Sequence, residues 1–338
     1  MPRRSERGGE RIGLAGGAGM SPETMPVAIP GLRVGAEVAA ALVDRRPVVG
    51  LETSVIGQGL PYPQNLECVD RLEAAIRGAG SVSAWVGVLN GEVVVGLSDE
   101  ELGAFTEPGR AEKVARRDLP AACARGGLGA TTVSATIWAA ARAGVRVSAT
   151  GGIGGVHPGE RRDVSADLME LSQTPGLLVC SGPKSIVDPA ATAERLEELG
   201  VTMAGYGVSR LPFFLAREAR VDLEHSVDTP GEAAAVLAAA IRLDTRSTIL
   251  LCNPIASEFA IDADEVAAAV RRCEDRADRE GVRGRDLTPF LLACLADETG
   301  GRSLEANLAL LESNAALAGA VSVAYASVAG GPTAARSG

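Results

Sequence analysis

Residues 145–157 read Val-Arg-Val-Ser-Ala-Thr-Gly-Gly-Ile-Gly-Gly-Val-His, a short apolar segment that runs directly into a glycine-rich loop. A helix-like run of small residues, Thr131–Ala143, precedes it, and a second apolar segment, Leu177–Cys180, follows it. This second segment leads into another loop, Ser181-Gly182-Pro183-Lys184. Strands that alternate with helices are typical of the α/β class. We therefore expect an α/β fold in which loops at strand ends carry ligand groups.

A hairpin signal indicates that the sheet is mixed rather than purely parallel. Ala84–Leu89 and Val93–Val95 flank Asn90-Gly91, a dipeptide favoured in two-residue hairpin turns. Further strands are expected at Pro47–Leu51 and Val201–Tyr206. The last third of the chain is expected to be mostly helical. Helical patterns occur at Leu66–Gly80, Ala190–Leu199, Glu232–Leu243, Asp264–Glu280, Thr288–Thr299 and Leu304–Ala318.

The organisation of the 338 residues indicates one domain, because there is no internal repeat and no convincing linker. We assign this domain to residues 31–325. The first 20 residues are rich in Arg and Gly and contain no apolar core, so they do not resemble a secretory signal. We expect residues 1–30 to form a disordered leader and residues 326–338 to form a flexible tail.

Charge and hydropathy argue against two classes of partner. The net charge is -10 and only 3% of the residues are aromatic, so the chain has neither the excess positive charge nor the aromatic side chains that typically bind nucleic acids. No apolar run approaches the roughly 20 residues of a membrane span. We therefore expect neither a nucleic-acid partner nor a membrane partner.

Cysteine and histidine usage bear on the compartment and on metals. The six cysteines form no C-x-x-C pair and stand mostly in apolar surroundings, so we expect buried free thiols in a reducing cytoplasm. The chain has only two histidines, His157 and His225, which disfavours a zinc site. Any bound metal should therefore be a hard cation held by oxygen ligands.

Lysine is rare in this chain: of 33 basic residues, only Lys113 and Lys184 are lysines. An amine can lose its proton and form a Schiff base, whereas a guanidinium group stays charged. The scarcity can equally reflect chance at two surface positions. Because Lys184 follows an expected buried strand in a Gly-Pro turn, it is the stronger candidate for chemistry.

The glycine-rich loop and its surroundings offer further candidates, each with two interpretations. Successive glycines let backbone N–H groups approach a phosphate, or they form only a tight turn. Asp163 and Asp167 would share a face of one helix and could hold a metal and a substrate hydroxyl. Alternatively, Asp163 or Ser165 is only the N-cap of that helix. Glu52 follows an expected strand and is a candidate acid or base, although such a glutamate can also be simply solvated.

Motifs of a known family occur in order along the chain. They are Leu51-Glu52-Thr53-Ser54, Pro61-x-Pro63-Gln64-Asn65, Lys113-Val114-x-Arg116-Arg117-Asp118-Leu119, Gly129-Ala130-Thr131-Thr132-Val133, Ala149–His157, Asp163-x-Ser165-Ala166-Asp167-Leu168, Lys184-Ser185-Ile186, Asn253-Pro254-Ile255, Thr288–Leu292 and Thr299-Gly300-Gly301-x-Ser303-Leu304-x-x-Asn307. Together, over about residues 31–320, they resemble the pseudouridine-5′-phosphate glycosidase family, also called indigoidine synthase A-like.

The resemblance implies a fold, an activity and a set of site residues. The fold would be a three-layer α/β/α domain with a mixed central sheet, often a homotrimer, so residues 31–325 would be a single catalytic domain. The enzyme would be a lyase that reversibly joins C5 of uracil to C1′ of ribose 5-phosphate. Lys184 would be the nucleophile, through a Schiff base, and Glu52 the proton donor. Asp163 would bind a divalent metal, usually Mn²⁺ and alternatively Mg²⁺. The implied substrate contacts are Lys113, Val133, His157, Ser165, Ala166, Asp167 and Asn307.

The chemistry of a C-glycosidic bond explains these residue types. Such a bond has no leaving oxygen or nitrogen to protonate, so the two-carboxylate scheme of ordinary glycosidases does not serve. Once the ribose ring opens and an amine adds at C1′, the C–C bond can break by a retro-Mannich step, which leaves a C=N bond between the nitrogen and C1′. An acid must then protonate the carbon of the base, a role that suits Glu52.

Departures from the family pattern leave the identity of the ring open. Gly57-Gln58-Gly59 replaces Ser-His-Gly, His157-Pro158-Gly159 replaces His-Arg-Gly, two residues are missing before Asp163, and Pro183 and Ser226 replace an alanine and an arginine. Two substrates therefore compete: uracil, in pseudouridine catabolism, and a different ring, in a dedicated C-nucleoside (antibiotic) synthase. The physiological direction also stays open. A remote alternative is a non-catalytic sugar-phosphate binding protein, and no Walker-type loop supports a phosphosugar kinase.

Overall fold

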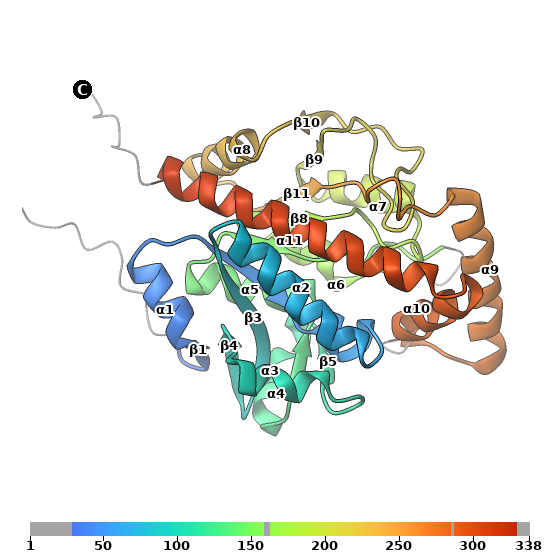
Figure 1. Ribbon diagram of the computed structural model, residues 1–338, viewed down its shortest axis with the longest axis horizontal. Helices are drawn as coiled ribbons and strands as arrows, with labels where there is room; N and C mark the ends of the chain where they lie inside the picture. The colour runs from blue at the N-terminus through green and yellow to red at the C-terminus, as the bar shows by residue number, and fades with distance from the viewer. Residues whose placement is uncertain (1–28, 159–162, 285–286, 330–338) are drawn as a thin grey trace, which may run out of the picture.

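The computed structural model describes residues 29–158, 163–284 and 287–329. Its strands are β1 (Leu32–Val34), β2 (Val48–Glu52), β3 (Val82–Leu89), β4 (Glu92–Val95), β5 (Glu112–Val114), β6 (Gly129–Thr131), β7 (Val147–Ala149), β8 (Gly176–Cys180), β9 (Met203–Tyr206), β10 (His225–Val227) and β11 (Thr248–Cys252). Within the described residues they form one 11-stranded sheet with the main order β1-β4-β3-β2-β7-β8-β11-β9-β10 (Figure 1). Strand β6 pairs with β3 and β5 beside this path. The neighbours from β3 through β2, β7, β8, β11 and β9 to β10 are all parallel.

Helices cover both faces of this sheet (Figure 1). One face carries α2 (Gln64–Gly78), α8 (Pro230–Arg242) and α11 (Arg302–Ala329); the other carries α1 (Ala36–Val43), α4 (Leu119–Arg125), α5 (Val133–Ala143), α6 (Ala166–Leu171) and α7 (Pro189–Glu198). The remaining helices are α3 (Asp99–Thr106), α9 (Ala263–Glu280), α10 (Leu287–Glu298) and the short η1 (Val55–Gly59) and η2 (Arg116–Asp118). The predicted three-layer α/β/α fold with a mixed sheet is confirmed.

Alternation along the buried strands explains why two helical layers are needed. In β8, Leu177 and Val179 belong to the core beneath α2, α8 and α11, while Leu178 and Cys180 belong to the core on the opposite face. A strand that is apolar on both faces must be covered on both faces. The predicted hairpin is also present: β3 and β4 pair antiparallel, and Asn90 and Gly91 have φ values of 52° and 86°.

The longest helix, α11, lies across the sheet next to α2 and α8 (Figure 1). By length and composition alone it could cross a membrane. However, many of its apolar side chains, among them Leu310, Ala315 and Ala318, are buried against α2, α8 and the sheet, so it is a core helix. It continues to Ala329, so residues 326–329 are helical although composition predicts a tail there. The remainder of the predicted tail and residues 1–28 of the predicted leader lie outside the described residues.

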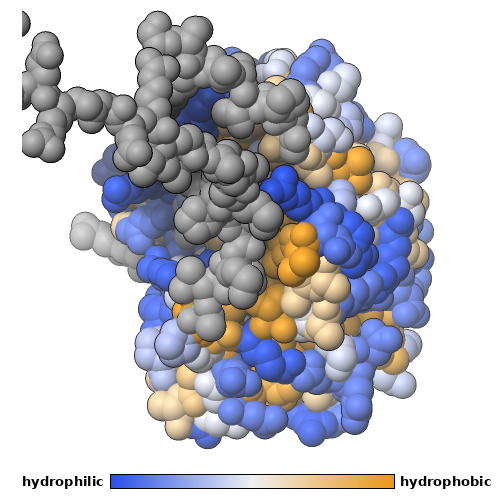
Figure 2. Space-filling model, turned by 90° about the vertical axis from the view of Figure 1, so that its left-hand side faces the viewer, coloured by the Kyte–Doolittle hydropathy of each residue, from blue (hydrophilic) through white to orange (hydrophobic). Residues whose placement is uncertain are grey.

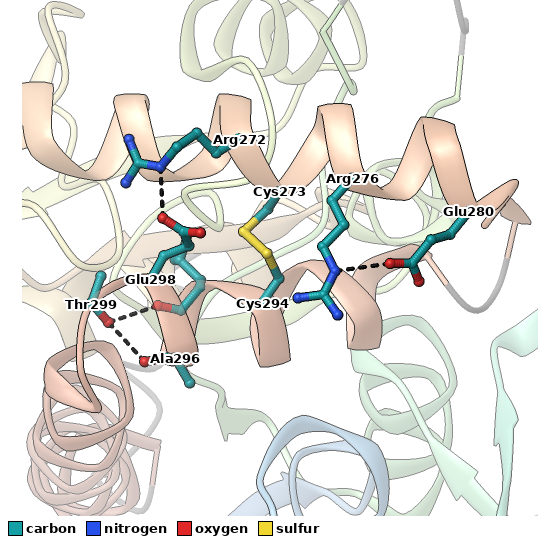
Figure 3. Close-up of a disulfide and its surroundings, with 9 residues drawn as sticks. Arg272, Cys273, Arg276, Glu280, Cys294, Ala296, Glu298 and Thr299 are labelled. Carbon is teal, nitrogen blue, oxygen red and sulfur yellow. Dashed lines mark hydrogen bonds and ion pairs between the residues drawn. A yellow bond between two sulfur atoms is a disulfide. The ribbon is translucent and has the colours of Figure 1, made fainter.

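The cysteine prediction is wrong for one pair. Cys273 of α9 and Cys294 of α10 form a disulfide that joins the two helices (Figure 3). These residues are 21 positions apart, and no sequence motif indicates that the helices pack with the two Cα atoms 5.7 Å from each other. Cys68, Cys180 and Cys252 are buried free thiols, as predicted. Because one pair is oxidised, cysteine usage does not by itself indicate a reducing compartment.

The two edges of the parallel sheet have different surroundings. The carboxyl ends of β2, β7 and β8 lie toward α10, at the right of Figure 1. The opposite end of the molecule faces the viewer in Figure 2, where hydrophobic residues appear between hydrophilic ones. Val43, the last residue of α1, Leu243 directly after α8 and Val328 near the end of α11 are exposed large apolar residues.

Candidate active site

A cavity of about 260 Å³ lies at the carboxyl edge of the sheet. Glu52 ends β2, Thr150 directly follows β7, and Lys184 stands in the loop after β8. Lys113 enters from β5. Parallel strands place their carboxyl-end loops side by side, which explains why residues far apart in the sequence meet here. Helices α10 and α11 complete the wall with Thr288, Leu292 and Asn307.

The Glu52 carboxyl group is buried but well supported. Its residue is 3% exposed. The Ser54 hydroxyl donates to Oε2 at 2.5 Å, and the Thr150 hydroxyl donates to Oε1. A buried carboxylate is costly unless hydrogen bonds stabilise it, and here each oxygen has one donor. The carboxyl group is thus held in a fixed orientation at the cavity wall, where it can exchange a proton with a bound molecule.

The turn before Lys184 requires glycine. Gly182 has a φ of 79°, and a Cβ at this position would lie 1.9 Å from the carbonyl oxygen of Pro212. This conformation brings the next residues against the glycine-rich loop, where the Lys184 N–H donates to the Ile153 carbonyl at 3.0 Å. The two loops that follow β7 and β8 are therefore held together, and Lys184 is positioned by both.

Asp167 connects the glycine-rich loop to α5. Its Oδ2 accepts from the Gly154 N–H at 3.0 Å and its Oδ1 from the Ser134 N–H at 3.1 Å. Gly154 has no room for a side chain, since a Cβ would lie 2.4 Å from the Ser165 hydroxyl. Asp167 is 6% exposed, so part of its role is to hold the loop in place.

The prediction that Asp163 and Asp167 share a helical face is wrong. Helix α6 begins only at Ala166, and Ser165 is its N-cap, with its hydroxyl accepting from the Asp167 N–H at 3.2 Å. Asp163 precedes the helix. Its backbone carbonyl accepts a hydrogen bond from the His157 N–H at 2.9 Å. The N-cap interpretation is therefore correct for Ser165. Asp163 still lines the cavity.

The two lysines of the chain meet in the same cavity. The pKa of Lys113 is lowered from its ordinary value, mainly because burial disfavours the charged form and then because the Lys184 ammonium lies nearby. The charges of Asp167, Glu52 and Asp163 oppose this shift. The cavity therefore contains an amine that loses its proton more readily than an exposed lysine does.

Nine of the ten predicted site residues line the cavity: Glu52, Lys113, His157, Asp163, Ser165, Ala166, Asp167, Lys184 and Asn307. The tenth residue, Val133, is not part of the cavity lining. It is the first residue of α5 and is buried beneath the wall, while its neighbour Thr132 reaches the cavity. The roles implied for all ten residues remain predictions.

Sequence reasoning missed the residues that hold the site together. Asn314 of α11 is fully buried and donates to the carbonyls of Thr150 at 2.9 Å and Gly151 at 3.3 Å. Its Oδ1 accepts from Asn253 at 3.0 Å. An asparagine within an apolar helical run was the available signal, because a buried amide needs partners. No sequence pattern indicated that the Ser54 hydroxyl binds Glu52, because this contact depends on the local backbone conformation after β2.

The suitability of the site for a metal depends on Asp163. The described residues contain no group of three or more His, Cys, Asp or Glu side chains that could hold an ion. The Asp167 oxygens already accept backbone N–H groups. Glu52 and Asp118 also line the cavity, but the Glu52 oxygens accept from Ser54 and Thr150, and Asp118 accepts from the Ala115 N–H. The Asp163 carboxylate suits a hard cation that keeps most of its water ligands. It does not suit zinc, which prefers several nitrogen or sulfur ligands.

Comparisons with known proteins agree with this geometry. The family model described as "Indigoidine synthase A like protein" matches residues 37–324. The chain belongs to this family. Pseudouridine-5′-phosphate glycosidase of Hahella chejuensis is 43% identical over 297 residues, covering 87% of this chain and 98% of the relative. The enzyme of the same name from Saccharopolyspora erythraea is 44% identical over 304 residues, covering 89% of this chain and 100% of the relative.

Two solved structures share the fold of this family member. The prealnumycin C-glycosynthase AlnA, in complex with ribulose 5-phosphate, has a TM-score of 0.81 and 40% identity, covering 88% of this chain and 98% of AlnA. The indigoidine synthase A (IdgA)-like protein of Thermotoga maritima has a TM-score of 0.79 and 37% identity, covering 90% of this chain and 99% of that protein. The predicted family is confirmed.

Proposed function

We propose that this enzyme makes or breaks the C–C bond between C1′ of ribose 5-phosphate and a carbon of uracil or a related ring. Family membership makes it an enzyme of C-glycosidic bonds. One observation carries the mechanism: both lysines and a buried carboxyl group line a single cavity at the carboxyl edge of the sheet. An amine and an acid are the two groups that such a bond requires.

The first step is the addition of Lys184 to the sugar. As the Lys184 Nζ forms a bond to C1′, the C1′–O4′ bond breaks and the ribose ring opens. The proton that leaves Nζ ends on O4′, which becomes a hydroxyl, and a neutral amine beside it can carry the proton between them. Lys113, whose pKa is lowered, is suited to accept that proton. Because the amine nitrogen then carries a lone pair next to the scissile bond, it can support cleavage as a guanidinium group cannot.

The second step breaks or forms the C–C bond. In cleavage, the lone pair of the C1′-bound nitrogen forms the C=N bond of an imine, and the C1′–C electron pair moves to the ring carbon. That carbon takes a proton from Glu52. Water then hydrolyses the imine and releases the sugar phosphate. In synthesis the same steps run in reverse, and Glu52 removes the proton from the ring carbon.

Asp163 is proposed to hold a divalent cation, Mn²⁺ or alternatively Mg²⁺. A bound cation of this type would help to orient sugar or phosphate oxygens by electrostatic attraction. The support is the position of the Asp163 carboxylate in the cavity wall.

A specific observation favours a ring other than uracil. Gln58, which replaces the family's histidine, lines the cavity. Its Nε2 donates to the Ala111 carbonyl at 2.8 Å, while its Oε1 is buried without a hydrogen-bond partner among the described residues. This neutral amide differs from imidazole in shape and in donors. The competing function is therefore a dedicated C-nucleoside (antibiotic) synthase.

Assembly and location complete the proposal. Exposed apolar residues such as Val43 and Leu243 support association of copies, and we propose a homotrimer. We also propose a cytoplasmic location, which cysteine usage does not decide, because four cysteines are free and one pair is joined. Sedimentation of the purified chain and cell fractionation test these two points.

The deciding experiment traps the covalent intermediate. Purified enzyme is mixed with ribose 5-phosphate, reduced with borohydride and digested for mass spectrometry. The expected result is the sugar mass on the Lys184 peptide. Modification of the Lys113 peptide alone would exchange the roles of the two lysines. No modification, together with full activity of Lys184→Arg, would refute the covalent mechanism and return the non-catalytic binding protein to consideration.

A further inference from the structure

A second hollow lies at the opposite edge of the sheet from the active site. Arg146 directly precedes β7, Pro175 directly precedes β8, and Arg246 stands shortly before β11, so this hollow is at the amino ends of three neighbouring strands. Its volume is about 460 Å³. Arg142 and Trp138 of α5 and Arg116 of η2 also line it, together with Ala141, Ser172, Gln173 and Thr174. It shares no lining residue with the catalytic cavity among the described residues.

The charge of this hollow is unbalanced. Arg116 is paired with the buried Glu170 at 2.6 Å. Within the described part of the chain, no carboxylate lies within 4.0 Å of the guanidinium groups of Arg142, Arg146 or Arg246. Three such arginines gather in a protein whose net charge is -10. Arg142 and Arg246 are exposed and Arg146 is half-buried, so water screens part of their repulsion, and a bound anion would remove more of it.

Trp138 supplies a second and independent indication. The Arg142 guanidinium lies 4.7 Å and that of Arg116 5.9 Å from its ring centroid, so stacking fixes the indole among the arginines. Its Nε1–H is buried and has no acceptor among the described residues. Buried donors are almost always paired in folded proteins. The hollow thus combines cationic donors with an unpaired indole N–H, and its described lining contains no carboxylate.

We propose that this hollow is a second anion site that binds a compact molecule carrying one or more phosphate groups. Phosphate oxygens are acceptors only, and the planar guanidinium forks of arginine match their geometry. The hollow also adjoins elements of the active site. Ala115 and Arg117 of the η2 region line the catalytic cavity on either side of Arg116, and α6 runs from the cavity at Ala166 to the hollow near Ser172. The proposal does not depend on the reaction assigned to the active site.

Trp138 permits a direct test, because the chain has only one other tryptophan, Trp85. In the full-length Trp85→Phe protein, the fluorescence of Trp138 is followed during titration with pyrophosphate at constant ionic strength. We expect a saturable change. We also expect the apparent Kd to rise at least ~10-fold when two charged donors are removed in Arg142→Gln/Arg146→Gln. The matched control, Arg271→Gln/Arg279→Gln, removes the same charge from exposed positions of α9 and should leave the Kd unchanged.

Calorimetry on the chain with both tryptophans provides the same comparison if Trp85→Phe does not fold. A Lys184→Met protein, which lacks this cation of the catalytic cavity, should bind pyrophosphate in the hollow as before, which separates this site from the proposed catalytic one. Three outcomes would overturn the proposal: an equal Kd in the hollow variant and its control, equal competition by chloride, or a changed assembly mass of Arg142→Gln/Arg146→Gln without any loss of pyrophosphate binding. The last outcome would assign the arginines to a contact between copies of the chain.

Discussion

The Thr150 hydroxyl donates a hydrogen bond to the Glu52 carboxyl group, and it links the ends of the neighbouring strands β7 and β2. The two residues are 98 positions apart in the sequence, and parallel pairing of their strands brings them together. The hydrogen bond holds the buried carboxyl group, while Ser54 holds its other oxygen. The orientation of the proposed proton donor therefore depends on a residue that does not take part in the proton transfer itself.

The first prediction concerns this relationship. Thr150→Val keeps the shape of the side chain but removes the donor, so kcat should fall about 10- to 100-fold with little change in KM. Thr150→Ser should restore most of the rate. Steady-state kinetics and the pH profile of kcat provide the measurement. Equal kcat values for the valine and serine variants would show that the hydroxyl does not position Glu52.

The second prediction follows from the lowered pKa of Lys113. The folded protein releases this proton at a lower pH than the unfolded chain, whose lysine has a pKa near 10.5. Between these two pKa values the unfolded state binds more protons, so stability rises with pH in this range. Lys113→Met, which has no charge to bury, should therefore be more stable than wild type at pH 7. The difference should shrink as the pH approaches 10.5 and above.

Thermal melts of both proteins over this pH range test the prediction, with the Tm of wild type at each pH as the reference for the variant. A difference in Tm that stays constant with pH would show that burial of the ammonium group is not what separates the two proteins. Activity should also rise with pH through the lowered pKa, since the neutral form of Lys113 is the proton acceptor.

The third prediction concerns the metal. Asp163→Asn should raise the Mn²⁺ concentration needed for half-maximal rate and should weaken Mn²⁺ binding measured by paramagnetic resonance. Chelation should remove activity, and Mn²⁺ should restore it better than Zn²⁺, because no His/Cys cluster exists in the described residues. Asp222→Asn changes a highly exposed aspartate and serves as the control. Full turnover after complete chelation would contradict the assignment.

The fourth prediction concerns the link between α9 and α10. Replacing both Cys273 and Cys294 by serine should destabilise the protein by roughly 3 kcal/mol, as expected for a loop of this length. A reducing agent should lower the Tm of wild type and leave that of the double variant unchanged. Ion pairs such as Arg272–Glu298, which also joins the two helices, persist in both proteins (Figure 3). Identical melting of wild type with and without reductant would show that this bond does not contribute to stability.

The fold was largely predictable because its signals are local. The Asn90-Gly91 turn, the apolar strand at Leu177–Cys180 and the loops after the strands each occupy one short stretch of sequence. The residues proposed for catalysis were selected through motifs of the same kind, and they line one cavity. The Cys273–Cys294 disulfide and the hydrogen bonds of Asn314 were not predicted, because they join residues brought together only by helix packing. The assignment of Asp163 to a helix failed because Ser165 caps α6 and starts it later.

The last prediction concerns the ring. Residues next to the proposed bond chemistry match the family, so ribose 5-phosphate should be accepted. Gln58, Pro158, Pro183 and Ser226 differ from the family pattern, and the segment before Asp163 is shorter. A site that hydrogen-bonds its substrate strongly rejects a ring that leaves buried polar groups unpaired. We therefore expect weak activity with uracil and better use of another nitrogen-containing ring or enolisable acceptor.

The measurement compares kcat/KM for uracil with that for a panel of such acceptors, alongside cleavage of pseudouridine 5′-phosphate. Gln58→His restores the family residue and should raise the ratio of uracil to the preferred acceptor, because the amide that is fixed to the Ala111 carbonyl is replaced by imidazole. Gln58→Glu, which keeps the length of the side chain but adds charge, serves as the comparison. Efficient cleavage of pseudouridine 5′-phosphate by the unmodified enzyme would assign it to pseudouridine catabolism. The substitution at Gln58 would then be neutral, as would those at Pro158, Pro183 and Ser226, which do not line the cavity, since recognition of uracil would be intact.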